Sequence, residues 1–296
     1  METLAAPLLR HRFRAMGTEI ELLVATDEAS GALAAAEAEF HRLEALLSRF
    51  RPDSELSRLN DEGTLAAGPD LLRVVELALA ARESTGGRFD IRVHGALVAA
   101  GYDRSFELVA PDDATPARFP ERQPGGVEVR DGVISLEDGV RLDLGGIGKG
   151  YAADLVAEGL VARGAVGACV SLGGDVRAAG DGPSEGRWAV PVEDPLDESR
   201  EMFTYPLEQG AIVTSTVRFR QWVHLGRRCH HIIDPATGAP ARTGVVAVVV
   251  ADAQAWRAEV LAKAALVAGV DAGRALLERH GVEAWIVSER PPGIHE

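Results

Sequence analysis

Glycine residues, one lysine and an apolar repeat of helical spacing come together in residues 141–160, RLDLGGIGKGYAADLVAEGL. The pattern predicts a short strand, a tight turn and a helix that begins near Lys149. Glycines let the backbone approach a ligand closely, and the first turn of a helix directs N–H groups toward an anion. The segment therefore indicates either a phosphate-binding turn or a strand-to-helix turn without a ligand.

The spacing of these glycines excludes a P-loop. The pattern G-x-x-x-x-G-K-[ST] requires a glycine where the chain has Asp143 and a hydroxyl residue where it has Gly150. The dinucleotide pattern G-x-G-x-x-G is a weak match, because its last position is Tyr151. Asp143 ends the predicted strand, where its carboxylate is placed to accept hydrogen bonds from a ribose or a base.

Two adjacent histidines, His230 and His231, precede an apolar pair and the turn sequence DPATG. On a strand they face opposite sides, so one is expected to reach a site while the other faces solvent. Histidine titrates near neutral pH, which suits a general base. A hydrogen-bonded structural histidine is the alternative, and no Ser-His-Asp set can be assigned from the sequence.

Three further segments have residue patterns that are more specific than a purely structural role requires. They read AMGTEI (15–20), SRFRPDSELSRLN (48–60) and GGRFD (86–90). Each segment either contributes to a site or has only a structural role. The structural role would be a bulge in a strand for the first, a solvated cap and turn around Ser54 and Asn60 for the second, and a turn with a core phenylalanine for the third.

The elements that must position these residues alternate irregularly along the chain. Helical spacing predicts helices over 28–50, 69–84, 149–163, 253–269 and 271–280. Short strand-like runs lie between them, including 10–25 with a turn at Gly17 and a last strand over 282–288. Without regular βαβ alternation, the pattern favours an α+β fold with mainly antiparallel sheets. We expect a single domain over 1–296, or two lobes, with a long loop at 103–125.

The charge of the chain limits its partners. A net charge of −14 argues against nucleic-acid binding and against docking on anionic membranes. No run of 18 apolar residues predicts a membrane span, and the N-terminus lacks the apolar core of a signal peptide. A cytoplasmic location is therefore expected. Any phosphate must be held locally, by backbone N–H groups, one or two basic side chains or a metal ion.

Taken together, the segments resemble the FAD:protein FMN transferases, the ApbE-like flavin transferases. The resemblance runs from about residue 12 to residue 287 and includes MGT, SRFRPDSELSRLN, GGRFD, LDLGGIGKGYAAD, SLGGDVRAAG, AIVTST and HHIIDPATG, in that order. It implies an ApbE-like, T-fold-like architecture. It also implies transfer of the FMN half of FAD to a threonine hydroxyl of an acceptor protein, with a magnesium ion at the pyrophosphate.

The resemblance also implies roles for individual residues. The implied FAD contacts are Met16, Phe50, Arg88, Phe89, Asp90, Asp143, Lys149 and Ile233. His231 is predicted to be catalytic. The carbonyl of Gly146 and the carboxylate of Glu259 are the predicted metal ligands.

The chain departs from the family pattern on the metal-binding helix. Glu259 stands where the family usually has aspartate, and Lys263 where it has threonine. We hypothesise that FAD is still bound and that Lys263, predicted to be catalytic, partly stands in for the metal ion. The alternatives are an FAD-binding protein without transfer activity and a pyrophosphatase that yields FMN and AMP.

Overall fold

A computed structural model describes residues 6–26, 30–109 and 125–289 of the 296-residue chain. Its centre is a seven-stranded sheet of order β1-β2-β6-β7-β10-β15-β16, in which each strand runs antiparallel to its neighbours. These strands are β1 (Leu8–Ala15), β2 (Thr18–Ala25), β6 (Gly167–Leu172), β7 (Asp175–Gly180), β10 (Gly210–Thr216), β15 (Val245–Asp252) and β16 (Glu283–Ser288). The predicted α+β class with mainly antiparallel sheets is confirmed.

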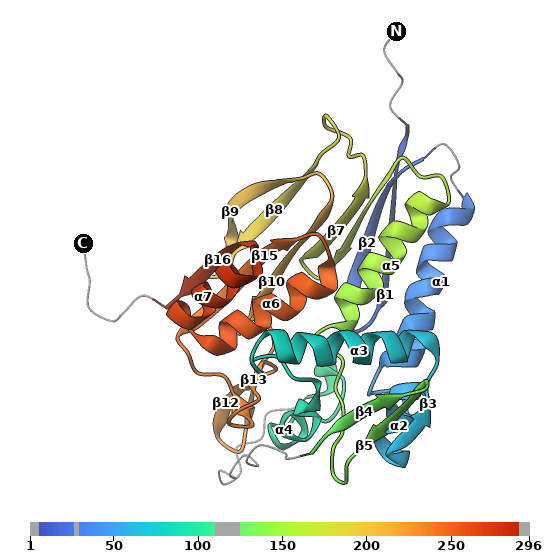
Figure 1. Cartoon of the computed structure of the whole chain (residues 1–296). Coiled ribbons are helices and arrows are strands. Elements are labelled where there is room, and N and C mark those ends of the chain that lie inside the picture. Colours follow the sequence, from blue (N-terminus) through green and yellow to red (C-terminus); the bar gives the residue numbers. More distant parts are fainter. Residues whose placement is uncertain (1–5, 27–29, 110–124, 290–296) are drawn as a thin grey trace, which may run out of the picture.

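Helices cover one face of this sheet (Figure 1). They are α1 (Ser30–Leu47), α5 (Gly148–Ala162), α6 (Ala255–Ala268) and α7 (Val270–His280). The opposite face is covered by the hairpin of β8 (Trp188–Asp194) and β9 (Asp197–Leu207), where Trp188 and Val190 join a second apolar cluster. Six successive residues of β15 are buried, as expected for a strand that is covered on both sides.

A smaller layer lies beyond one end of the sheet and carries much of the site (Figure 1). Its helices are α2 (Glu55–Glu62), α3 (Pro69–Ser84) and α4 (His94–Ala99), with short 3-10 helices at Ile91–Val93 and Phe106–Leu108. A small sheet has the order β3-β5-β4, formed by Thr64–Ala66, Val133–Leu136 and Val127–Arg130. Two hairpins complete the layer, β11 (Gln221–His224) with β12 (Arg227–His230) and β13 (Ile233–Asp234) with β14 (Ala239–Pro240).

All five predicted helices are present as α1, α3, α5, α6 and α7, and the last predicted strand is β16. Most boundaries agree within two residues; α1 ends three residues earlier than predicted. The part of the expected 103–125 loop up to residue 109 contains the 3-10 helix Phe106–Leu108, and residues 110–124 lie outside the described residues. The single-domain interpretation stays a prediction. None of the helices in the described ranges combines the length and the hydropathy of a membrane span.

The alternative of a solvated cap and turn in residues 48–60 is correct in the cap and wrong in its exposure, because Ser54 is buried and begins a helix. Ser54 is fully buried, and its hydroxyl accepts a hydrogen bond from the Ser57 N–H at 3.0 Å, capping α2. The buried Leu56 and Leu59 face the core. Sequence reasoning missed this helix because eight mostly polar residues give a weak helical signal, and capping fixes its start.

The strand predicted to lead into the glycine turn is absent, since residues 140–144 belong to no sheet. The side chain of Asn60 takes the place of a neighbouring strand there. Its amide donates to the Leu142 carbonyl at 2.9 Å and its oxygen accepts the Leu142 N–H at 2.7 Å. The side-chain amide of Asn60 thus makes the two hydrogen bonds that a neighbouring β-strand would otherwise make with the Leu142 backbone.

Met16 and Gly17 form the two-residue turn between β1 and β2. Both have positive φ, 53° and 70°, and Ala15 pairs with Thr18. This is the geometry of a tight hairpin turn whose twist matches that of the strands. The bulge alternative is therefore wrong, and the turn places Met16 beyond the end of the sheet.

Helices α5 and α6 meet at their N-terminal ends through reciprocal contacts. The Asp154 carboxylate of α5 accepts the N–H groups of Ala255 and Trp256, each at 3.0 Å, at the start of α6. The Glu259 carboxylate of α6 accepts the Gly150 N–H at 3.0 Å near the start of α5. Each helix thus supplies the anion that its partner's N-terminus favours.

Gly150→Ala tests the close approach of these helices. A Cβ at position 150 would lie 2.5 Å from the backbone N and Cα of Trp256, so the two helices would have to separate. We expect the free energy of unfolding, measured in urea, to fall by about 2 kcal/mol, a usual cost of overpacking.

Gly159→Ala is the matched control in the same helix. A Cβ there meets only the Arg163 guanidinium, at 3.5 Å, and alanine is a better helix former by about 1 kcal/mol. This variant is expected to be at least as stable as the parent. Equal destabilisation by both substitutions would contradict the proposed contact.

Candidate active site

A cavity of about 350 Å³ opens where the smaller layer meets the ends of α5 and α6. Sequence segments that lie far apart in the chain form its lining, including the β1–β2 turn, the end of α1, the 86–90 turn, the glycine turn and residues 231–235. Predicted site residues that line it are Met16, Phe50, Arg88, Phe89, Asp90, Asp143, Gly146, Lys149, His231, Ile233 and Lys263. Glu259 lies behind this lining, in the wall of a small adjoining cavity that it shares with Lys149 and Asp175.

The lining is locally basic in a strongly acidic chain. It contains six arginine or lysine side chains and four carboxylates, whereas the whole chain has a net charge of −14. The basic residues are Arg49, Arg51, Arg88, Lys149, Arg220 and Lys263. The cavity therefore suits an anionic ligand.

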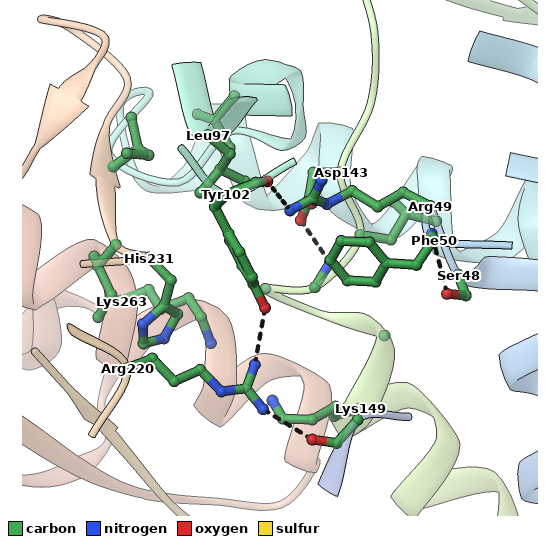
Figure 2. A pocket seen from close by; sticks show the side chains of 18 of the residues that line it. Ser48, Arg49, Phe50, Leu97, Tyr102, Asp143, Lys149, Arg220, His231 and Lys263 are labelled. Atoms are coloured by element: carbon green, nitrogen blue, oxygen red, sulfur yellow. Dashed lines mark hydrogen bonds and ion pairs between the residues drawn. The ribbon is translucent and has the colours of Figure 1, made fainter. Parts of the chain in front are cut away.

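Arg49 organises one wall of the cavity (Figure 2). Its side chain is 5% exposed and pairs with the Asp143 carboxylate at 2.5 Å, while it also donates to the Tyr102 carbonyl at 2.7 Å. The guanidinium carbon lies 4.1 Å from the centre of the Phe50 ring and 4.8 Å from that of Tyr102. The planar cation thus fixes two aromatic rings by stacking and charge.

Asp143 was predicted to accept hydrogen bonds from a ribose or a base. In the structure, Arg49 takes one of its oxygens, and the other accepts the Gly145 N–H at 2.8 Å. Asp143 therefore fixes the glycine turn and the position of Arg49, and a nucleotide would meet a carboxylate that already has partners.

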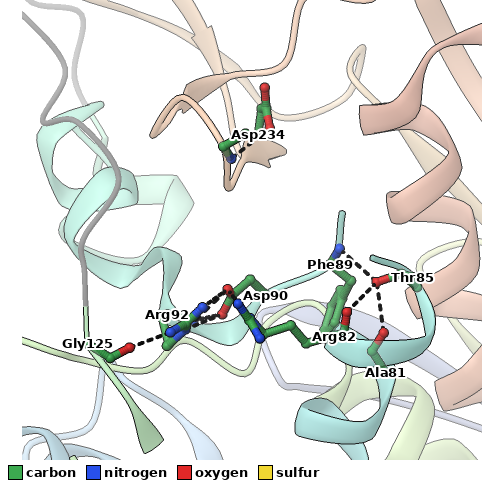
Figure 3. A network of polar contacts seen from close by, with 9 residues as sticks. Ala81, Arg82, Thr85, Phe89, Asp90, Arg92, Gly125 and Asp234 are labelled. Atoms are coloured by element: carbon green, nitrogen blue, oxygen red, sulfur yellow. Dashed lines mark hydrogen bonds and ion pairs between the residues drawn. The ribbon is translucent and has the colours of Figure 1, made fainter. Parts of the chain in front are cut away.

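Asp90 is held between two arginines (Figure 3). It accepts from Arg82 at 2.9 Å and from Arg92 at 2.5 Å, and it also caps the 3-10 helix through the Arg92 N–H. Burial alone would raise the pKa of this carboxyl, but the bonds to Arg92 and Arg82 hold it below its usual value. Asp90 thus holds the Arg88–Phe89 turn against the cavity.

Lys149, Glu259 and Lys263 form a cluster of buried charge beside the glycine turn. One oxygen of Glu259 faces both ammonium groups, Lys263 at 3.0 Å and Lys149 in closer contact. Asp175 is 3.5 Å from Lys149. Burial alone would raise the pKa of Glu259, but the two lysines lower it to about 2. The carboxylate therefore stays ionised throughout the neutral range.

His231 and His230 have different surroundings, although both are partly buried. His231 lines the cavity, and its Nδ1 is buried without a hydrogen-bond partner among the described residues. Burial, together with Arg220 and Lys263, holds its pKa well below the usual value, so the ring is neutral at pH 7. His230 is partly buried and bonds to the Ala241 carbonyl at 2.9 Å, so the alternative of a hydrogen-bonded structural histidine describes it.

Comparison with known proteins agrees with this geometry. A model of the ApbE family matches residues 16–286. The chain belongs to the ApbE family. It is 30% identical to the FAD:protein FMN transferase of Vibrio cholerae over 262 residues, which cover 84% of this chain and 77% of the relative. It is 33% identical to that of Treponema pallidum over 268 residues, 82% of this chain and 73% of the relative.

Solved ApbE structures share the fold. The ApbE protein of Thermotoga maritima superposes with a TM-score of 0.85 at 27% identity, covering 95% of this chain and 94% of that one. The flavin transferase ApbE of Vibrio cholerae gives 0.79 at 25% identity, covering 96% and 94%. The family predicted from the sequence motifs is confirmed.

The donors present in this ApbE-family protein do not fit the implied magnesium ion. Magnesium takes near-octahedral oxygen ligands at short distances. The expected carboxylate, Glu259, has one oxygen on the Gly150 N–H and the other on two ammonium groups. In the described part of the chain, no group of three or more His, Cys, Asp or Glu side chains is arranged to hold a metal ion.

Four residues of this ApbE site were missed by sequence reasoning. Arg49, Tyr102 and Arg220 line the cavity, and Asp175 contacts Lys149. Arg220 donates to the Gly17 carbonyl at 3.2 Å and so ties the β1–β2 turn to residues beyond β10. Arg49 in SRFR and Asp175 in LGGDV lie within segments that the sequence singled out, and Arg220 lies four residues after AIVTST, but only packing shows that they converge.

Glu259→Gln tests the buried charge cluster. Glu259 is 1% exposed, and removing its charge leaves two buried ammonium groups without their main partner. We expect the free energy of unfolding at pH 7 to fall by about 3 kcal/mol. The pKa of Glu259 is lowered from 4.5, so its stabilisation is present above pH 4.5 and is lost as the pH falls toward 2. Urea denaturation over this range measures the difference between variant and parent.

Glu62→Gln supplies the control for this loss of charge. Glu62 also pairs at i,i+4 spacing, with Arg58 at 3.7 Å, but both side chains are more than half exposed. Exposed pairs contribute less than about 1 kcal/mol. A Glu259→Gln effect as small as this would contradict the assignment of a coupled buried cluster.

Proposed function

We propose that this chain transfers FMN from FAD to a threonine hydroxyl of an acceptor protein. The main observation behind the proposal is the basic cavity, because residues from sequence motifs that lie far apart in the chain line it together. The naming of the relatives from Vibrio cholerae and Treponema pallidum as FAD:protein FMN transferases supports it. The threonine in the acceptor and the cytoplasmic location remain predictions from the sequence.

The cavity offers distinct surroundings for the two parts of FAD. Phe50, Tyr102 and Phe106 form a linked aromatic cluster, with ring centres 5.7 Å apart between the first two and 6.4 Å between the last two. Flat rings of this kind suit a flavin or adenine ring. Lys149, Arg220 and Lys263 lie toward the hydroxyl end of Tyr102 (Figure 2), where they suit the two phosphates.

The proposed reaction is a phosphoryl-type displacement. The acceptor hydroxyl oxygen forms a bond to the phosphorus of the FMN half, and the bond from that phosphorus to the bridging oxygen breaks. AMP leaves with the bridging oxygen, and a base takes the hydroxyl proton. The cations along the cavity stabilise negative charge on the transferring group and on AMP.

His231 is the proposed base. Its ring lines the cavity, and among the described residues its buried Nδ1 has no hydrogen-bond partner. The nitrogen that faces the cavity would take the proton. Burial, together with Arg220 and Lys263, lowers the pKa of the ring and keeps it neutral, which is the form that a general base requires. Bound phosphates would offset these cations and raise the basicity of the ring when the substrate is present.

Incubation with FAD and a purified acceptor domain tests the proposed function. We expect the acceptor to gain the mass of one FMN less one water in intact-protein mass spectrometry, with one AMP released. Replacement of the acceptor threonine by alanine should abolish the gain. Free FMN and AMP with unmodified acceptor would instead establish hydrolysis, and bound but uncleaved FAD would establish a binding protein.

His231→Gln is expected to lower kcat for FMN transfer by about 100-fold or more, the usual contribution of general base catalysis. The FAD dissociation constant should change less than threefold, since the variant keeps the charge of a neutral ring. His41→Gln is the control, because that histidine side chain is 48% exposed on α1. Transfer at the parental rate by His231→Gln would exclude its role as the base.

A further inference from the structure

We propose that Lys263 is a built-in cation that takes the place of a divalent metal ion, so that this chain binds the FAD diphosphate without magnesium. The inference rests on the proposed function for the identity of the ligand. It states which group of the protein balances the negative charge of the diphosphate.

The use of lysine in the chain is the first observation. Of its 31 lysine and arginine residues, only Lys149 and Lys263 are lysines. Both contact the same oxygen of Glu259. An ammonium group is a compact point charge, whereas a guanidinium is planar and presents a fork of donors. The chain thus places its only two ammonium groups together, beside the glycine turn.

The path of the Lys263 side chain is the second observation. A Cβ built on Gly146 would lie 3.4 Å from Cδ and 3.5 Å from Cε of Lys263, and 3.0 Å from the Phe89 ring. The lysine stem therefore lies along Gly146, whose carbonyl was the predicted metal ligand. The ammonium ends at Glu259, the other predicted ligand, at 3.0 Å.

Glu259 is fixed in the protein interior, so the Lys263 ammonium that it binds is held in one place. Glu259 is 1% exposed and is held by the Gly150 N–H, so it cannot follow a mobile lysine into solvent. Lys263 nevertheless lines the main cavity, and its side chain is 16% exposed. Its ammonium is thus fixed by protein on one side and open to a ligand on the other.

The local charge also favours a ligand anion over a metal ion. The acidic partners Glu259 and Asp175 are balanced by the two lysines, and Arg220 adds a further positive charge to the cavity. A magnesium ion at Glu259 would lie against two ammonium groups, which repel it. A diphosphate carries the opposite charge and gains from all three cations.

Calorimetric titration of the unmodified protein with FAD is the direct test. We expect dissociation constants within twofold of each other in EDTA and in millimolar MgCl₂, and no heat when MgCl₂ alone is added. Binding that is tenfold or more tighter with magnesium would overturn the inference. Absence of FAD binding in both buffers would overturn the proposed function and this inference with it.

Lys263→Met keeps the apolar stem and removes the charge. We expect the FAD dissociation constant in EDTA to rise at least tenfold and part of this loss to be recovered by MgCl₂, because Glu259 then lacks one of its cations. Lys263→Arg, which keeps the charge, should lose less affinity. An unchanged dissociation constant for Lys263→Met in EDTA would contradict the proposal.

Amine labelling gives a readout on the unmodified protein that depends neither on activity nor on a variant. Apart from the N-terminus, acetic anhydride has only two amines to modify. In EDTA, saturating FAD should reduce acetylation of Lys263 by several fold in peptide mass spectrometry. Equal labelling with and without FAD, under conditions where calorimetry shows binding, would place the ligand away from this ammonium and overturn the inference.

Discussion

The reciprocal carboxylate contacts between α5 and α6 are the constraint on which the site depends. Asp154 of α5 accepts the first N–H groups of α6, and Glu259 of α6 accepts an N–H near the start of α5. Gly150 brings the two backbones together where no side chain fits. Because both helix starts are fixed in this way, Lys149 and Lys263, one on each helix, meet at a single point.

This arrangement limits how far the N-terminus of α5 can bind an anionic ligand. A free N-terminus would attract phosphate through its N–H groups, but Glu259 already occupies part of that position at α5. The positive charge offered to the cavity therefore comes from side chains, which the buried carboxylates hold in place. An acidic protein can then present a basic cavity, in which Arg49, Lys149 and Lys263 are each fixed by a carboxylate behind them.

Ion pairs recur around the cavity, where they hold the residues of its walls in position. Asp143 fixes Arg49, which in turn orders Phe50 and Tyr102. Asp90, held by two arginines, fixes the turn that carries Arg88 and Phe89. The predicted site residues other than Glu259 line the cavity, but these two carboxylates are engaged by protein partners. Their contribution to a nucleotide site is to position its walls.

The sequence by itself determined the family, the five long helices and the segments that contribute to the cavity, because helical spacing and ordered motifs are local in the chain. It did not predict α2 or the absence of a strand at 140–144, since a capping serine and one asparagine amide decide these through contacts. Nor did it show that His230 is tied to a carbonyl, or that Lys149 reaches Glu259 110 positions away. Only the tertiary structure decided these points, because the energy of a buried charge or amide depends on which partner packing brings within reach.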